Sequence, residues 1–359
     1  MHIKPFVLLL VSLSALISCD GTRENAPVEN TEDNLSLAVE NAVDKKIIPT
    51  VDGFVDQTGQ LSTTAESFCA TPDTGGLTTL QERWKSLSAQ WYKLAIYNFG
   101  PLNDDQIFPK VNFIDSLRLR GTNYIETVRS ENSNNIAGTH VLDEAFFDGQ
   151  SFQKVGVLAL ESLVFETAAS EHSKKPEDIV AEYGNSPRKC EILKGLSKQL
   201  VKHAGYIQNG WKSDHKASGK PFRTIFLNNE IADGTPSLTR LIASVQEHLD
   251  YLQKRGVATT AAQVSEYSWD NITSSIDEVE MLLAGTDDSG PSFFGLMSSG
   301  GFQNAVDSVN ENITRVRQDI QRKDAAALEI SLGKLDGNFK REIPDGLEVQ
   351  LGINFTDGD

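Results

Sequence analysis

Glu161 is the residue in this sequence whose surroundings point most clearly to chemistry. It lies in the segment GVLALESLVF at 156–165, whose other residues are almost all apolar or small. A carboxylate in such surroundings is partly buried, and a buried carboxylate either finds a hydrogen-bonding partner or takes up a proton. Two interpretations stay open. Glu161 lines a cleft as a ligand or hydrogen-bonding group, or it is a structural residue paired with Arg118, Arg120 or a tryptophan N–H.

The histidines give little support for a metal or acid–base site. The segment GTHVLDE at 138–144 places His140 three residues before Asp143, but its polar, turn-forming surroundings predict a loop or short helix. The remaining histidines after residue 20 are scattered without the spacing of metal ligands. A His-Glu-x-x-His helix, a Gly-rich phosphate loop and a serine nucleophile elbow are all absent from the sequence.

The first of the three cysteines lies at the end of an N-terminal signal. Residues 6–17 form an apolar run after a short basic start, and the sequence LISC at 16–19 resembles a bacterial lipobox. We therefore expect residues 1–19 to form a lipoprotein signal peptide, Cys19 to carry the acyl chains that hold the protein on the membrane, and the polar residues 20–33 to form a flexible tether. An ordinary cleaved signal with a chance cysteine is the alternative.

Export would place the two other cysteines, Cys69 and Cys190, in an oxidising compartment. A disulfide between them is the simplest expectation there, and two free thiols are the alternative. The expected location is the bacterial cell envelope. Asp20 resembles the inner-membrane retention signal of enteric bacteria, but this rule varies among bacteria, so the membrane is not fixed by the sequence.

The net charge narrows the range of partners. The 359 residues include 33 Lys and Arg against 50 Asp and Glu, a net charge of −17. Nucleic acid and anionic headgroups repel such a chain, so nucleic acid is not an expected partner. The length favours two domains, and the hydrophobic content of 39% is enough to form a core.

Helical periodicity dominates the chain after the tether. Apolar residues recur at spacings of three and four in the segments 80–94, 193–211 and 238–252. Further helices are expected near 34–66, 108–130, 152–170, 266–284, 301–322 and 325–341. Strand-like alternation is nearly absent, apart from a short stretch at 347–353.

These patterns predict an all-α fold of two packed helical bundles. Turn-forming residues between 212 and 235 divide the chain into an N-terminal bundle at 34–218 and a C-terminal bundle at 219–359. The second bundle ends in a short extended tail.

Several segments, in order along the chain, resemble the imelysin-like family. The segment 156–165 resembles the family signature Gly-x-His-x-x-Glu followed by an apolar run, and 84–101 resembles its tryptophan-rich helix ending in Phe-Gly-Pro. The sequence SPRKC at 186–190 resembles its second half-motif, and GINFTDGD at 352–359 the ending of its lipoprotein branch. The resemblance covers about residues 70–359, and the two later cysteines fall where that branch carries a cysteine pair.

This resemblance implies a two-bundle helical fold and a place in bacterial iron uptake. The founding member of the family was described as a peptidase, and the signature helix was proposed as a metal site. Iron or another divalent metal is therefore the candidate cofactor, although the sequence does not identify it.

The sequence departs from the family signature at one position. Gly156 and Glu161 match the motif, but Leu158 stands where the motif has histidine. A histidine three residues before a glutamate shares its helix face and can bind the same metal ion, whereas leucine has no lone pair to donate. Glu161 remains the one candidate metal ligand of this helix, and we expect no catalytic residue.

The leading hypothesis is a membrane-anchored, non-catalytic lipoprotein that binds a metal, a metal complex or an envelope partner. One alternative is a metallopeptidase with other ligands. A second is a purely structural or interaction lipoprotein.

Overall fold

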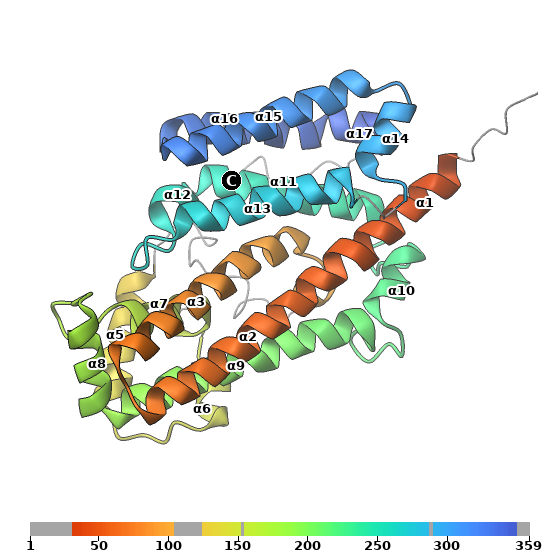
Figure 1. The fold of residues 1–359 in the computed structure, drawn as a ribbon. Coiled ribbons are helices and arrows are strands. Elements are labelled where there is room, and N and C mark those ends of the chain that lie inside the picture. Colours follow the sequence, from red (N-terminus) through yellow and green to blue (C-terminus); the bar gives the residue numbers. More distant parts are fainter. Residues whose placement is uncertain (1–30, 104–123, 152–153, 287–289, 350–359) are drawn as a thin grey trace, which may run out of the picture.

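The computed structural model describes residues 31–103, 124–151, 154–286 and 290–349, and these are helical without β-strands (Figure 1). The elements are α1 (Thr31–Ala42), η1 (Val43–Ile47), α2 (Ile48–Ala70), α3 (Thr74–Leu94), η2 (Ala95–Tyr97), η3 (Gly100–Asn103), α5 (Ile125–Ala137), α6 (Glu144–Asp148), α7 (Gly156–Phe165), α8 (Pro176–Asn185), α9 (Pro187–Lys212), α10 (Phe222–Leu227), α11 (Ser237–Lys254), α12 (Val257–Thr260), α13 (Ser268–Ala284), α14 (Phe293–Ser299), α15 (Gln303–Arg322), α16 (Ala325–Lys340) and α17 (Glu342–Gly346). The predicted all-α fold is confirmed. The expected signal peptide at 1–19 with Cys19, and the expected helix at 108–130 up to residue 123, lie outside the described residues. Of the stretch expected to be extended at 347–353, residues 347 and 348 form a turn, and 350–353 lie outside the described residues.

The first group of helices is built around α2, α3 and α9. Helix α2 packs against both α3 and α9, and α7 packs against α3, α5 and α9. The apolar stripe predicted at 80–94 is the inward face of α3, with Leu80, Trp84, Leu87 and Trp91 all buried. The stripe predicted at 193–211 is likewise the inward face of α9. Periodicity of three and four thus placed both helices and their buried faces correctly.

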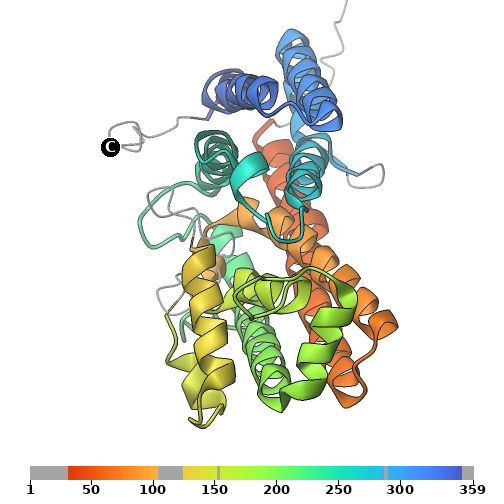
Figure 2. The same ribbon diagram turned by 90° about the vertical axis from the view of Figure 1, so that its left-hand side faces the viewer.

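The second group consists of the long helices α11, α13, α15 and α16. Helix α16 packs against α11 and α15, and α13 packs against α15. Figure 2 shows this group stacked above the first. Among the described residues, no helix has both the length and the apolar character needed to cross a bilayer.

The two groups share one continuous hydrophobic core. Helix α13 packs against α3, and α11 packs against η2. Helix α10, which follows residue 218, packs against α9 of the first group. The rings of Phe222 and Trp211 meet edge to face, with their centroids 5.0 Å apart. Side chains from both groups form the same core cluster. The division of the chain into two bundles at 218/219 remains a prediction.

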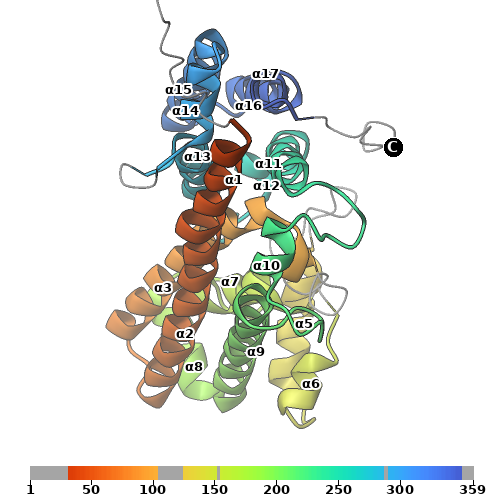
Figure 3. The ribbon, with the colours of Figure 1, turned by 90° about the vertical axis from the view of Figure 1, so that its right-hand side faces the viewer.

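The segment α1–η1–α2 runs as one unbroken helical rod past both groups (Figure 3). It begins at Thr31, so the last three residues of the expected tether are helical. Its central turn, η1, is a π-helix, which shifts the register of the side chains by widening the turn. In this turn Lys46 is buried, with its Nζ 3.7 Å from an oxygen of Glu278 on α13. Thr50 and Tyr97 donate hydrogen bonds to the other oxygen of Glu278, at 2.8 Å and 2.7 Å.

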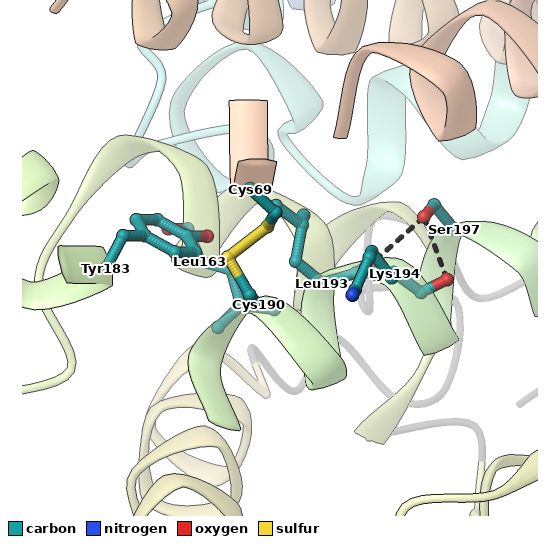
Figure 4. The surroundings of a disulfide bond; sticks show 7 residues. All are labelled: Cys69, Leu163, Tyr183, Cys190, Leu193, Lys194 and Ser197. Atoms are coloured by element: carbon teal, nitrogen blue, oxygen red, sulfur yellow. Dashed lines mark hydrogen bonds between the residues drawn. A yellow bond between two sulfur atoms is a disulfide. The ribbon is translucent and has the colours of Figure 1, made fainter. Parts of the chain in front are cut away.

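The structure joins Cys69 and Cys190 in a disulfide (Figure 4). The bond links the end of α2 to the first turn of α9, with the two Cα atoms 5.6 Å apart. The cysteines are 121 positions apart in the sequence, so the bond closes a long loop in the unfolded chain. Cross-linking lowers the conformational entropy of the unfolded chain, and the reduction grows with the length of the closed loop.

We predict that the C69S/C190S double variant unfolds with a free energy about 3–5 kcal/mol lower than the oxidised wild type. The loss comes from the larger conformational entropy of its unfolded state. Urea unfolding with and without dithiothreitol measures it, and the double variant, which has no bond to reduce, is the control for other effects of the reductant. Identical midpoints for oxidised and reduced wild type would contradict the prediction.

Candidate functional site

Helix α7, which carries the signature segment, lies inside the first group of helices. All of its residues from Gly156 to Val164 are buried. The indole N–H of Trp84 donates to the carbonyl of Val157 at 2.9 Å, and the hydroxyl of Tyr183 donates to that of Leu163 at 3.1 Å. Side chains of the neighbouring helices therefore fix the backbone of α7 at both ends. The indole N–H of Trp84 is therefore used for the backbone of α7 and not for Glu161.

Glu161 is buried and bonded to a residue of the second group. Glu161 is only 1% exposed. Its Oε1 accepts hydrogen bonds from the backbone N–H and the hydroxyl of Ser265, at 2.8 Å and 2.7 Å. Ser265 lies in the loop between α12 and α13. The carboxyl group on α7 thus holds a loop of the neighbouring bundle. Ser265 was not predicted as a partner of Glu161, because a serine in a polar loop 104 positions away carries no sequence signal of this contact.

The loop that presents Ser265 has an unusual backbone. Ala262 and Glu266, on either side of Ser265, both adopt left-handed conformations, with φ of 46° and 60°. Residues with a Cβ rarely adopt such angles, and tertiary contacts must compensate for the strain. The two hydrogen bonds to Glu161 are contacts of this kind, so they fix the loop as well as the carboxylate.

The buried environment of Glu161 changes its acidity. Loss of hydration raises the pKa of Glu161 to about 7, against an ordinary value of 4.5. The nearby Glu166 also raises this pKa, whereas the hydrogen bonds from Ser265 and the charge of Lys174 lower it. Below neutral pH the group is therefore a neutral carboxylic acid, with Oε1 as the hydrogen-bond acceptor for Ser265.

A second buried carboxylate, Glu166, follows α7 and was also missed from the sequence. Its two oxygens accept bonds from Nε and Nη2 of Arg129 on α5, at 2.8 Å and 2.6 Å, and the Ser162 hydroxyl donates to it at 3.0 Å. These hydrogen bonds raise the pKa of Arg129. The paired guanidinium keeps Glu166 in a fully compensated ion pair. Glu166 is therefore structural, and it is not available to complete a ligand set with Glu161.

The described residues around α7 offer no ligand set for a metal ion. Leu158, in the position of the motif histidine, packs in the core and offers no donor atom. Across the part of the chain that the structure describes, no group of three or more His, Cys, Asp or Glu side chains is arranged to hold a metal. The partners considered for Glu161, Arg118 and Arg120, lie outside the described residues. Glu161 as a metal ligand therefore stays an untested prediction, without support from its neighbours.

The segment 138–144, expected to be a loop or a short helix, is a loop at 138–143 that leads into the short helix α6. Asp143 caps α6 by accepting the N–H of Phe146 at 2.9 Å, and the His140 ring lies against Phe146 with the centroids 4.7 Å apart. The side chains of His140 and Asp143 are thus used for capping and packing.

The model of the Imelysin family matches residues 47–348. An imelysin-like protein from Psychrobacter arcticum is similar in structure, with a TM-score of 0.64 and 14% identity over 89% of this chain and 98% of that one. An iron-regulated protein A precursor from Parabacteroides distasonis has a TM-score of 0.61 and 15% identity over 90% of this chain and 97% of that one. No curated protein matches the chain.

We predict that Glu161 makes the stability of the protein fall as the pH rises through the window from about 4.5 to about 7. In this window the folded state keeps a proton that the unfolded state has lost, so the stability present below the window is lost above it, by about 3 kcal/mol at most. E161Q keeps a neutral group and an acceptor for Ser265. Above pH 7 this variant should therefore be at least as stable as the wild type.

Urea unfolding of wild type and E161Q across this pH range measures the difference. E329Q, at an exposed glutamate of α16, is the matched control, and its pH profile should follow that of the wild type. Parallel profiles for wild type and E161Q would contradict the raised pKa.

Proposed function

The chain belongs to the imelysin family, and from this premise we propose that it is a membrane-tethered, non-catalytic binding protein of bacterial iron acquisition. In this role it takes up a metal complex or an envelope partner protein, and α7 acts as a joint between the bundles. The name of the Parabacteroides distasonis relative, an iron-regulated protein A precursor, supports the link to iron.

One observation carries the non-catalytic part of this proposal. The motif carboxylate is buried and accepts two hydrogen bonds from Ser265, and the motif histidine is replaced by Leu158. A peptidase site needs a group that activates water beside an accessible substrate, and a metal that does so needs several protein ligands. Glu161 supplies a single carboxyl group that is sealed from solvent. Its contacts support a role in fixing the two bundles relative to one another.

The tether part of the proposal rests on the lipobox-like sequence that ends at Cys19. Eleven polar or small residues, 20–30, separate this cysteine from the described start of α1. An extended chain of that length spans up to about 35 Å, which is enough to hold the bundles clear of the headgroups.

We predict that the wild type and E161Q, as residues 20–359, give the same calorimetric titrations with Fe²⁺ and Zn²⁺. Because Glu161 is bonded to Ser265, removing its charge removes no metal site. Ferric citrate and haem serve as metal complexes in the same experiment, and envelope proteins are tested by crosslinking and capture. A stoichiometric Fe²⁺ or Zn²⁺ site that E161Q abolishes contradicts the proposal. Absence of any bound complex together with absence of any captured envelope partner contradicts it too.

We predict that C19A moves the protein from the membrane fraction to the soluble fraction of the cell envelope, because multiple acyl chains supply the attachment. Fractionation with labelled palmitate measures both the attachment and the lipid. S18A, which keeps the small residue before the cysteine, is the control and should stay on the membrane. Equal membrane attachment of C19A and wild type would contradict the prediction, because an anchor other than the acyl chains of Cys19 would then hold the protein on the membrane.

A further inference from the structure

A large groove lies far from α7, where the start of α1 faces α10 and the beginning of α11. Its volume is about 990 Å³, and residues 347–349 are part of its lining. We name it the α1 groove. Helices α1, α10 and α11 are seen together in Figure 3, whereas α7 lies on the opposite side of Figure 1 from α1 and α10. Neither Glu161 nor Ser265 lines the groove.

Four leucines contribute to the lining of the α1 groove, and Leu37 of α1 is the exposed one among them. Leu35 and Leu227 are half-buried against the core, and Leu238 is buried. Leu37 is 46% exposed, which makes it one of the few large apolar residues of the described chain that face solvent. Covering such a side chain is favourable, by about 25 cal/mol for each Å² removed from water. Leu37 therefore offers an apolar contact to a segment that lies in the groove.

The charges of the groove are predominantly negative. Among the described residues that line it, Asp33, Glu40 and Glu348 contribute three carboxylates, against the single cation Arg223. Arg223 is already engaged, since Nε and Nη2 donate to the two oxygens of Asp44 at 2.6 Å each, and Nη2 donates to Glu40 at 2.8 Å. These bonds raise the pKa of Arg223 and hold its guanidinium against α1.

Glu348 is the carboxylate best placed to meet a ligand. It is exposed and lines the groove, and no ion pair found among the described residues includes it. The chain turns sharply here, because Glu348 adopts a left-handed backbone with φ of 55°. The negative charge of the whole chain, −17, reinforces the attraction for a cation at this point.

From this combination we propose that the α1 groove binds a short amphipathic segment of a partner protein, with apolar side chains against Leu37 and a lysine or arginine at Glu348. The groove follows α1 from Asp33 to Glu40, about 10 Å of helix, which suits a stretch of three or four extended residues. The charge complementarity selects a basic segment and repels an acidic one. The inference deepens the proposed function, on whose binding role it rests, by giving the place and chemistry of the partner contact.

Fluorescence anisotropy with the protein as residues 20–359 tests this proposal. The probes are a labelled peptide of alternating leucine and lysine, and a matched peptide with glutamate at each lysine position. We expect the lysine peptide to bind more tightly than the glutamate peptide, and more weakly as salt is added. L37S should weaken the lysine peptide about fivefold, because roughly half of a leucine side chain is no longer covered. E348K should weaken it about threefold and strengthen the glutamate peptide.

The matched control is I330S, which removes an exposed apolar residue of α16 outside the groove; Ile330 is 64% exposed, against 46% for Leu37. It should leave binding unchanged, and circular dichroism shows that each variant is folded. Equal affinities for the two peptides, no binding of the lysine peptide, or equal effects of L37S and I330S would overturn the proposal.

Two other occupants are separate outcomes that also overturn it. A concentration-dependent dimer that L37S abolishes assigns the groove to a second copy of the chain. A gain in peptide affinity on deletion of 350–359 assigns it to the chain itself. Because the groove is remote from Glu161, a metal site at Glu161 would remove the proposed function while leaving the peptide result unchanged, so the two failures are distinguishable.

Discussion

The buried carboxyl group of Glu161 constrains how the two groups of helices pack around α7. Glu161 is enclosed by the apolar residues of its own helix, and the Ser265 backbone and hydroxyl are its hydrogen-bond donors. Removing those donors would leave an unsatisfied buried group, at a cost of about 1–3 kcal/mol. The loop between α12 and α13 must therefore keep its strained backbone, and the two groups of helices must keep their relative position. The glutamate of the signature-like segment therefore connects two bundles here.

Two other buried carboxylates, Glu166 and Glu278, also have hydrogen-bonding partners on neighbouring helices. Arg129 pairs with Glu166 below α7, and Glu278 collects bonds from Thr50 and Tyr97 between the two groups. Ion pairs of this kind add little net stability, because desolvation offsets most of the attraction. They do penalise other arrangements, since any shift leaves a charge without its partner. We infer that these contacts select one arrangement of the helices, while the apolar core supplies most of the stability.

The sequence predicted the helices well and the contacts of Glu161 poorly, for a physical reason. Periodic apolar residues such as Leu80, Trp84 and Leu87 belong to one helix, so their spacing alone shows which face is buried. The burial of Glu161 followed from its apolar neighbours for the same reason. Its partner did not, because Ser265 lies on another bundle and its approach depends on how the helices pack. The π-turn that directs Lys46 toward Glu278 is a tertiary effect of the same kind, without a local sequence signal.

The central claim is that Glu161 is satisfied by Ser265 and holds no metal. Anomalous diffraction from crystals of residues 20–359 grown with Fe²⁺ or Zn²⁺ tests it most directly, because it locates any metal and shows the Glu161 oxygens together. The account predicts no anomalous peak beside α7 and Ser265 at hydrogen-bond distance from Oε1. A well-occupied peak at Glu161, with nitrogen ligands from elsewhere in the chain and Ser265 displaced, would contradict it.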